Sequence, residues 1–325
     1  MKKSLLTLCL VIAALSGFAW LALYRHSALA PGRSAPATAG TARQTQVSAG
    51  EQDLAALKAK AARAPRILPV FGLNGESLAV RQKALDALAP PYTPEEIAAA
   101  IAFLHSTGER PGVPRGVEHV LKNGLMDLLT RQGAPPTNLL QELCALYNDR
   151  QQDSVTRDYA VQYVIANGLR ETARSAADRP VVREALWEAL NETDSSISGT
   201  ALLGLHRLAA IDPAVETNRL DQAALRLTSE PGVGNLARTT ALQVCAQRRL
   251  TVALPSAAEL AKNGDNITVQ AAAIAALADL GAEPELELLQ ALRKQDQPAL
   301  RMAINSALRR LEKRLAPRNG QASPR

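Results

Sequence analysis

Aromatic residues are scarce in this sequence, since Phe, Trp and Tyr together make up 3% of its 325 residues. So few aromatic side chains supply little material for β-strands or for stacking on the bases of a nucleic acid. Apolar residues nevertheless reach 47%, mostly as Ala, Leu and Val. Ala and Leu are strong helix formers, and the small Ala side chain lets helices approach closely. The composition therefore predicts an all-α protein.

Cysteine and histidine are also scarce, with three cysteines and four histidines in the chain. Cys9 lies in an N-terminal apolar run, and about 100 residues separate Cys144 from Cys245. A bridge needs Cα atoms within about 7 Å, so we expect two buried free thiols. No two histidines are three or four positions apart, and no phosphate-binding, dinucleotide-binding or Gly-x-Ser-x-Gly motif occurs. We predict no catalytic, cofactor-binding or metal-binding residue, and a protein that is not an enzyme.

The net charge of +6 comes from the two ends of the chain. Residues 1–50 carry +5, residues 309–325 carry another +5, and the part between them carries −4. Binding to nucleic acid needs a positive face that displaces counterions from the phosphates. The slightly acidic body offers none, so no nucleic-acid partner is expected.

An apolar run of 19 residues, from Leu5 to Leu23, follows Lys2 and Lys3. Its length is close to the roughly 20 residues that cross a bilayer, and the flanking positive charges favour a cytoplasmic N-terminus. We predict a membrane anchor over 1–26, a flexible linker over 27–50, and a single-pass protein of the inner membrane with its body on the periplasmic or extracytoplasmic side. The alternative is a cleaved signal sequence and secretion, favoured by the small-x-small pattern of residues 28–30.

Short helical patterns separated by Pro and Gly breaks fill the chain from residue 51 to 315, before a basic tail over 316–325 that we expect to be disordered. One pattern recurs: a polar residue, then a small residue three positions on, followed by apolar positions. Its copies begin 30 to 41 residues apart, the length of a helix pair that must stack on its neighbours to bury its apolar face. The copies begin at residues 81, 121, 157, 198, 238, 270 and 300.

The small residue of each copy has a physical purpose, because a large side chain at a helix crossing would hold the two axes apart. It is Ala in most copies, and Asp153 and Asp265 precede two of them as candidate N-caps. The second helix of each pair is expected near residues 94–106, 136–147, 180–192, 213–228, 255–262 and 284–294, with a break at Arg179-Pro180.

Two stretches carry the pattern best, Asp265–Gly281 (DNITVQAAAIAALADLG) and Asp296–Leu311 (DQPALRMAINSALRRL). In them the sequence resembles the HEAT-repeat family, and the resemblance extends over roughly residues 76–312. It implies an α-α superhelix, a HEAT/armadillo-like solenoid of about six to seven helical hairpins, whose second helices line a concave face. The family's Arg is replaced at Ser198 and Gln270, so a continuous Arg ladder is not expected.

The same resemblance implies binding rather than a defined chemistry, so we predict a scaffold for an unidentified protein partner. The alternatives are an accessory or regulatory subunit of an enzyme, of the HEAT-like lyase type, and a structural envelope component without a specific ligand. The candidate contact residues are one aromatic side chain on an apolar helix and the cations near helix ends. They are Trp187, Arg248, Arg249, Arg309, Arg310 and Arg314.

Overall fold

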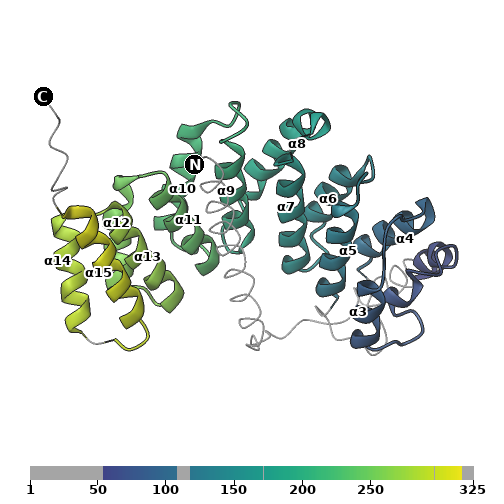
Figure 1. The fold of residues 1–325 in the computed structure, drawn as a ribbon, viewed down its shortest axis with the longest axis horizontal. Coiled ribbons are helices and arrows are strands. Elements are labelled where there is room, and N and C mark those ends of the chain that lie inside the picture. The colour runs from purple at the N-terminus through teal and green to yellow at the C-terminus, as the bar shows by residue number, and fades with distance from the viewer. Residues whose placement is uncertain (1–53, 108–117, 171, 296, 317–325) are drawn as a thin grey trace, which may run out of the picture. The chain divides into compact units, whose positions relative to one another are not determined.

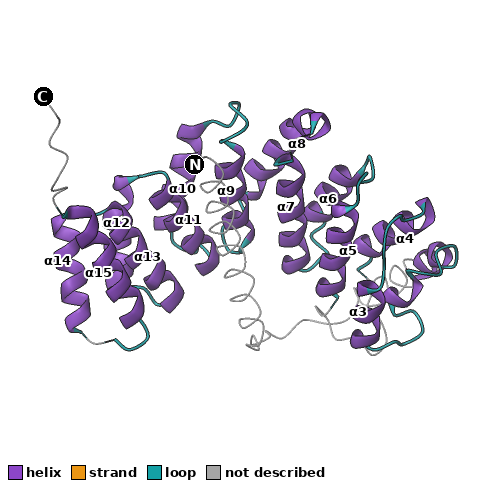
Figure 2. Cartoon of the chain, in the orientation of Figure 1, coloured by secondary structure: helices purple, strands orange, loops and turns teal. Residues whose placement is uncertain are grey.

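The computed structural model describes residues 54–107, 118–170, 172–295 and 297–316, and all the helices named below lie in the part of the chain from residue 49 onward. Every regular element in these ranges is a helix, and no strand occurs in them (Figures 1 and 2). A helix over residues 54–61 and a 3-10 turn, η1 (Leu68–Phe71), come first. They are followed by α3 (Leu78–Asp86), α4 (Pro94–His105), α5 (His119–Arg131), α6 (Leu139–Asn148), α7 (Ser154–Gly168), α8 (Ala173–Ala189), α9 (Ile197–Leu208), α10 (Thr217–Ser229), α11 (Asn235–Gln247), η2 (Thr251–Ala253), α12 (Leu254–Asn263), α13 (Ile267–Leu280), α14 (Glu283–Lys294) and α15 (Arg301–Leu315). The predicted all-α fold is confirmed.

The helices form two layers that differ in how tightly they pack. Odd-numbered helices from α3 to α15 each contact the next odd-numbered helix along the stack. Most even-numbered helices pack chiefly on the odd-numbered helix that follows them, and they touch one another only slightly. This is the layered stacking of a helical-repeat solenoid, as the spacing of the sequence copies predicts (Figure 1). The even layer, made of the predicted second helices, is the more open of the two.

Small residues lie where the odd helices cross, as predicted. The side chains of Ala160, Ala201, Ala241 and Ala273 are fully buried, whereas Ala84 and Ala303, near the two ends of the stack, are partly buried. Gly199 goes further than Ala: a Cβ atom built on it would lie 2.8 Å from the Cα atom of Ala237. The backbones of α9 and α11 therefore meet directly at this crossing.

Local signals set where the helices begin. Asp153 caps α7, its carboxylate accepting hydrogen bonds from the backbone N–H groups of Val155 (3.1 Å) and Thr156 (2.9 Å). For α13 the cap is Asn266, whose side chain accepts from the N–H groups of Thr268 and Val269, and not its predicted neighbour Asp265.

The predicted break at Arg179-Pro180 is wrong, because Pro180 lies inside α8. Proline removes one intrahelical hydrogen bond and crowds the preceding turn. Contacts with neighbouring segments hold this stretch in place. Arg179 donates to the carbonyl oxygens of Gly168 (3.5 Å) and Ile211 (3.3 Å), and Arg183 pairs with Asp212 at 2.6 Å.

Two buried arginines repeat the same contacts in different repeats. Arg81 donates its Nε hydrogen to the carbonyl of Val70 (2.9 Å) and pairs with Glu118 (2.9 Å). Arg157 does the same with the carbonyl of Tyr147 (2.7 Å) and with Glu192 (2.5 Å), and its guanidinium lies over the Tyr147 ring.

The next copy carries Ser198 where an Arg would continue the series, which is the predicted gap in the ladder. A further polar link joins α7 to α9, in the two repeats that Arg157 and Glu192 also connect. Ser196, at the N-terminus of α9, donates a hydrogen bond to the buried carboxylate of Asp158 on α7 at 2.5 Å. This hydrogen bond therefore adds to the contacts between α7 and α9, and it does not fill the gap that Ser198 leaves between α9 and α11.

The predicted anchor, 1–26, and linker, 27–50, lie outside the described residues, as does nearly all of the tail. In the part of the chain that the structure describes, no helix combines the length and the apolar character that a membrane span requires. This finding corrects the prediction of a single-pass membrane protein.

Candidate functional site

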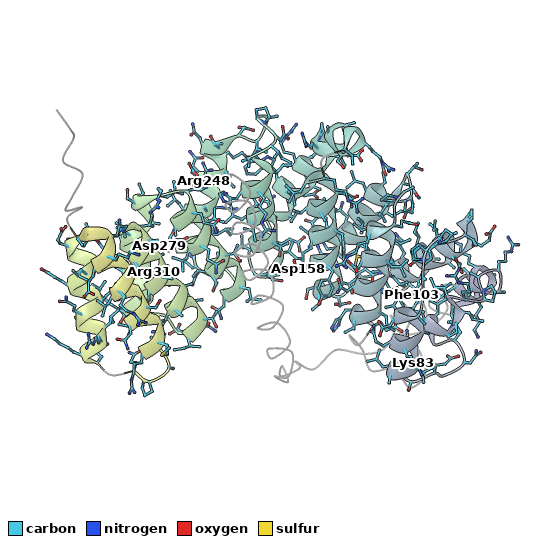
Figure 3. The ribbon with its side chains drawn as sticks, viewed as in Figure 1. Lys83, Phe103, Asp158, Arg248, Asp279 and Arg310 are labelled. Carbon is cyan, nitrogen blue, oxygen red and sulfur yellow. The ribbon has the colours of Figure 1, made fainter. Side chains whose placement is uncertain are left out.

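Four of the five cations predicted as contact residues form links between repeats. Arg248 pairs with Asp221 of α10, and Arg249 donates to the carbonyl oxygen of Asp279 at 2.9 Å. Arg310 pairs with the Asp279 carboxylate at 3.0 Å, and Arg314 donates to the carbonyl oxygen of Gly281. Arg249 and Arg314 thus satisfy carbonyl groups at the end of α13, and the four side chains together connect α10, α11, α13 and α15. Figure 3 labels Arg248, Asp279 and Arg310.

These contacts limit what the four arginines can offer to a partner. Each guanidinium already forms a hydrogen bond or an ion pair with a neighbouring helix. Arg249 also adopts a left-handed backbone conformation (φ 59°) at the end of α11. Arg309, beside Arg310 on α15, is exposed. Of the four linking arginines, only Arg248 is partly buried, and the other three are exposed as Arg309 is.

Trp187 has a different setting, at the edge of a recess between α8 and α10. Its indole ring is partly buried and carries the guanidinium of Arg219 on its face, with the Arg219 Cζ atom 4.1 Å from the ring centroid. A cation at this distance from an indole is attracted by the negative face of the ring. The stacked pair joins the two even-numbered helices across the recess.

The recess has a volume of about 260 Å³ and a defined chemical character. Its apolar part is formed by Trp187, Leu190 and Ala223. Two guanidinium groups and two amides complete it, supplied by Arg219, Arg226, Asn191 and Gln222. No carboxylate is among these lining residues, so the recess, hereafter the Trp187 groove, is cationic inside a body whose net charge is negative.

The open packing of the even layer explains why a groove lies here. Helices α8 and α10 are separated by α9, against which both pack. The side chains of Leu190 and Ala223 are buried beneath the opening, while Asn191, Gln222 and Arg226 reach solvent. Arg226 donates to the carbonyl oxygen of Leu190 at 3.3 Å and so occupies one of the orphan acceptors at the end of α8.

Other titratable side chains have internal explanations. Lys122 is buried and donates to the Ser106 carbonyl (2.7 Å) and to Gln152 (2.6 Å), and His105 lies 3.0 Å from Glu142. No group of three metal-ligating side chains occurs in the residues that the structure covers.

Cys144 and Cys245 are free thiols, as predicted, although Cys144 is only partly buried. Burial, with a smaller contribution from Glu188, raises the pKa of Cys144 to about 11, and burial also raises the pKa of Cys245. Both stay protonated at neutral pH, which makes them poor nucleophiles.

The sequence predicted Trp187 as a contact residue but did not indicate Arg219 or Arg226, which lie in the same groove. Arg219 and Arg226 are seven residues apart, which places them on one face of α10 two turns apart. That spacing was available in the sequence. The contact with Trp187 was not, because it joins helices from successive repeats whose relative position depends on how those repeats stack.

Comparison with known proteins yields little for this chain. No protein-family model matches it, and no curated protein is significantly similar. The solved structure of human deoxyhypusine hydroxylase in complex with glycerol matches with 18% sequence identity and a TM-score of 0.33. The match covers 82% of this chain and 98% of that one.

This match corrects one prediction. The chain was predicted not to be an enzyme from its helical-repeat character and its lack of catalytic motifs, and that exclusion is wrong as it stands because the similar structure is that of an enzyme.

Proposed function

We propose that this protein is a helical-repeat interaction module that holds a protein partner in the Trp187 groove. The observation that carries the proposal is the groove itself, a recess of about 260 Å³ whose surface combines Trp, Arg and amide side chains. Trp and Arg are the residue types most enriched among the side chains that dominate binding energy at protein interfaces.

The stacked fold supports the same proposal. A solenoid exposes a long series of helices on each side, and such surfaces serve as extended binding faces. Such a groove suits a chain segment of a partner that lies between α8 and α10. A nucleic-acid partner is not proposed, since the part of the chain between residues 51 and 308 carries a net charge of −4.

Site-specific photo-crosslinking in cells tests the proposal with the full-length protein. A photoreactive residue replaces Gln222 in the groove or, as the matched control, Gln290, which is also an exposed glutamine on an even-numbered helix. We expect one reproducible partner adduct at position 222, little at 290, and loss of the 222 adduct when Trp187→Ala is added.

The crosslinked peptide of the partner is then identified by mass spectrometry. An adduct that forms equally at both positions, or that persists in the Trp187→Ala protein, overturns the groove as the binding site. Because Trp187 is only partly buried, we expect the Trp187→Ala protein to stay folded, and its thermal melting curve checks this.

A further inference from the structure

We propose that the partner segment in the Trp187 groove is acidic and extended, with two carboxylates three residues apart and an apolar side chain between them. This inference rests on the proposed function and specifies its ligand. Three features of the groove support it: the spacing of its two guanidinium groups, the way each is held, and the apolar floor between them.

The spacing comes from the geometry of α10. Arg219 and Arg226 are seven residues apart on this helix, so their Cα atoms are about 10 Å apart along the axis. A segment in the polyproline II conformation rises about 3.1 Å per residue with three residues per turn, so positions i and i+3 share one side about 9 Å apart. Two carboxylates at this spacing match the two guanidinium groups.

Arg219 is held in a way that leaves it suited to a carboxylate. Its guanidinium lies over the face of Trp187, with Cζ 4.1 Å from the ring centroid, and this contact restricts the side chain without using its N–H donors on another acceptor. Glu216 lies 3.7 Å away, beyond hydrogen-bonding distance, and the Arg219 side chain is 54% exposed. A pre-positioned guanidinium can receive a carboxylate through two parallel hydrogen bonds with little loss of side-chain freedom.

Arg226 is also positioned before any ligand arrives. One Nη atom donates to the Leu190 carbonyl at 3.3 Å, and the other lies 3.6 Å from the Glu230 carboxylate. These contacts hold the side chain over the groove while 44% of it remains exposed. The two arginines therefore present cationic groups at the two ends of one recess.

The floor between the arginines is apolar and is edged by amides. Leu190 and Ala223 are buried beneath it, so one apolar side chain of the ligand would displace water from this surface. Asn191 and Gln222 carry both donors and acceptors, which suit the backbone of an extended segment that has no partner strand.

Tryptophan fluorescence gives a direct measurement, because the chain holds only two tryptophans, Trp20 and Trp187. In the full-length Trp20→Phe protein, the emission reports Trp187 alone. The probe is a short peptide with the pattern Glu-x-Leu-Glu, compared with the uncharged Gln-x-Leu-Gln peptide and with a peptide whose two glutamates are adjacent. The expected result is saturable binding of the first peptide, weakened by salt, with at least about tenfold weaker binding of the other two.

Variants on α10 test the roles of the two guanidinium groups. Arg219→Gln and Arg226→Gln should each weaken binding about fivefold or more, and Arg219→Lys should restore only part of the affinity because a lysine cannot donate in the same fork. Arg131→Gln, which removes an exposed cation from α5, is the matched control and should bind like the parent.

Two results overturn the inference: equal binding of the Gln peptide, or unchanged binding by both α10 variants. The crosslinking experiment separates this failure from that of the proposed function. If a partner still crosslinks at position 222, the groove remains a binding site and only the acidic ligand class is wrong.

Discussion

At the scale of single residues, buried arginines tie consecutive repeats together. Arg157 combines a carbonyl, a carboxylate and an aromatic face, and its side chain is 7% exposed. We expect Arg157→Met to lower the free energy of unfolding by about 3 kcal/mol, because Glu192 would lose a close partner in a largely buried place. The effect should fall at the low end of the range for buried pairs, since Arg150 also lies 2.8 Å from Glu192.

Urea denaturation of the full-length protein measures this loss. Arg131→Met is the control, because Arg131 is 79% exposed and pairs with Asp127 only one helical turn away. It should cost no more than about 0.5 kcal/mol. Equal losses of unfolding free energy in the two variants would mean that the buried contacts of Arg157 stabilise the stack no more than an exposed ion pair does.

At the scale of helices, the crossing of α9 and α11 depends on the absence of a side chain at Gly199. Ala there would place a methyl group against the backbone of Ala237, which cannot rotate away. We expect Gly199→Ala to destabilise the protein by about 1–3 kcal/mol, despite the better helix propensity of Ala.

The control is Gly133, which follows α5 and where an added Cβ would meet nothing within 4 Å. Its φ is not in the left-handed region, so Gly133→Ala should stay within about 1 kcal/mol of the parent. Melting temperatures and urea midpoints of the two variants measure these changes in stability. A more stable Gly199→Ala protein would mean that the two helices do not approach as closely as described.

The helices themselves were largely predictable from the sequence, because apolar period and Pro or Gly breaks are local signals. The predicted second helix at 213–228 corresponds to α10, and that at 284–294 to α14. The beginning of α8 was missed because residues 173–179 are mostly polar and Pro180 resembles a terminator.

Contacts between repeats were the harder part to predict. The sequence indicated Trp187 as a contact residue, and it placed Arg248 and Arg310 near helix ends without indicating their partners. Their acceptors, Asp221 and Asp279, lie about 30 residues away along the chain. Whether such residues meet depends on the stacking of neighbouring helices, which no local pattern records.

At the scale of the whole stack, stability is a sum of repeats and of the interfaces between them, so one poor interface sets a weak point. The α7–α9 interface contains Asp158, whose side chain is 1% exposed and whose Oδ1 atom has no hydrogen-bond partner among the described residues. Burial raises the pKa of Asp158, and its polar neighbours, led by the hydroxyl of Ser196, only partly offset this effect. The carboxylate is thus less stable in the folded protein than in water.

The sign of the resulting pH dependence follows from proton linkage. With a folded-state pKa above the unfolded value of about 3.8, the folded protein binds more protons at Asp158 in the interval between the two. Its contribution to stability is greatest below the unfolded pKa and is lost as pH rises through the folded pKa. Asp158→Asn removes this titration and leaves an amide that still accepts from Ser196. Relative to the parent, the variant should therefore gain stability as pH is raised from 4 to 7.

Melting temperatures of parent and variant, measured across that pH range, give the difference directly. Taking differences removes the effects of groups common to both proteins, such as His206, whose pKa is lowered mainly by burial and which weakens the fold below about pH 6.5. A difference that does not change with pH would mean that the Asp158 carboxylate reaches water at the α7–α9 interface, and that this interface is not the weak point of the stack.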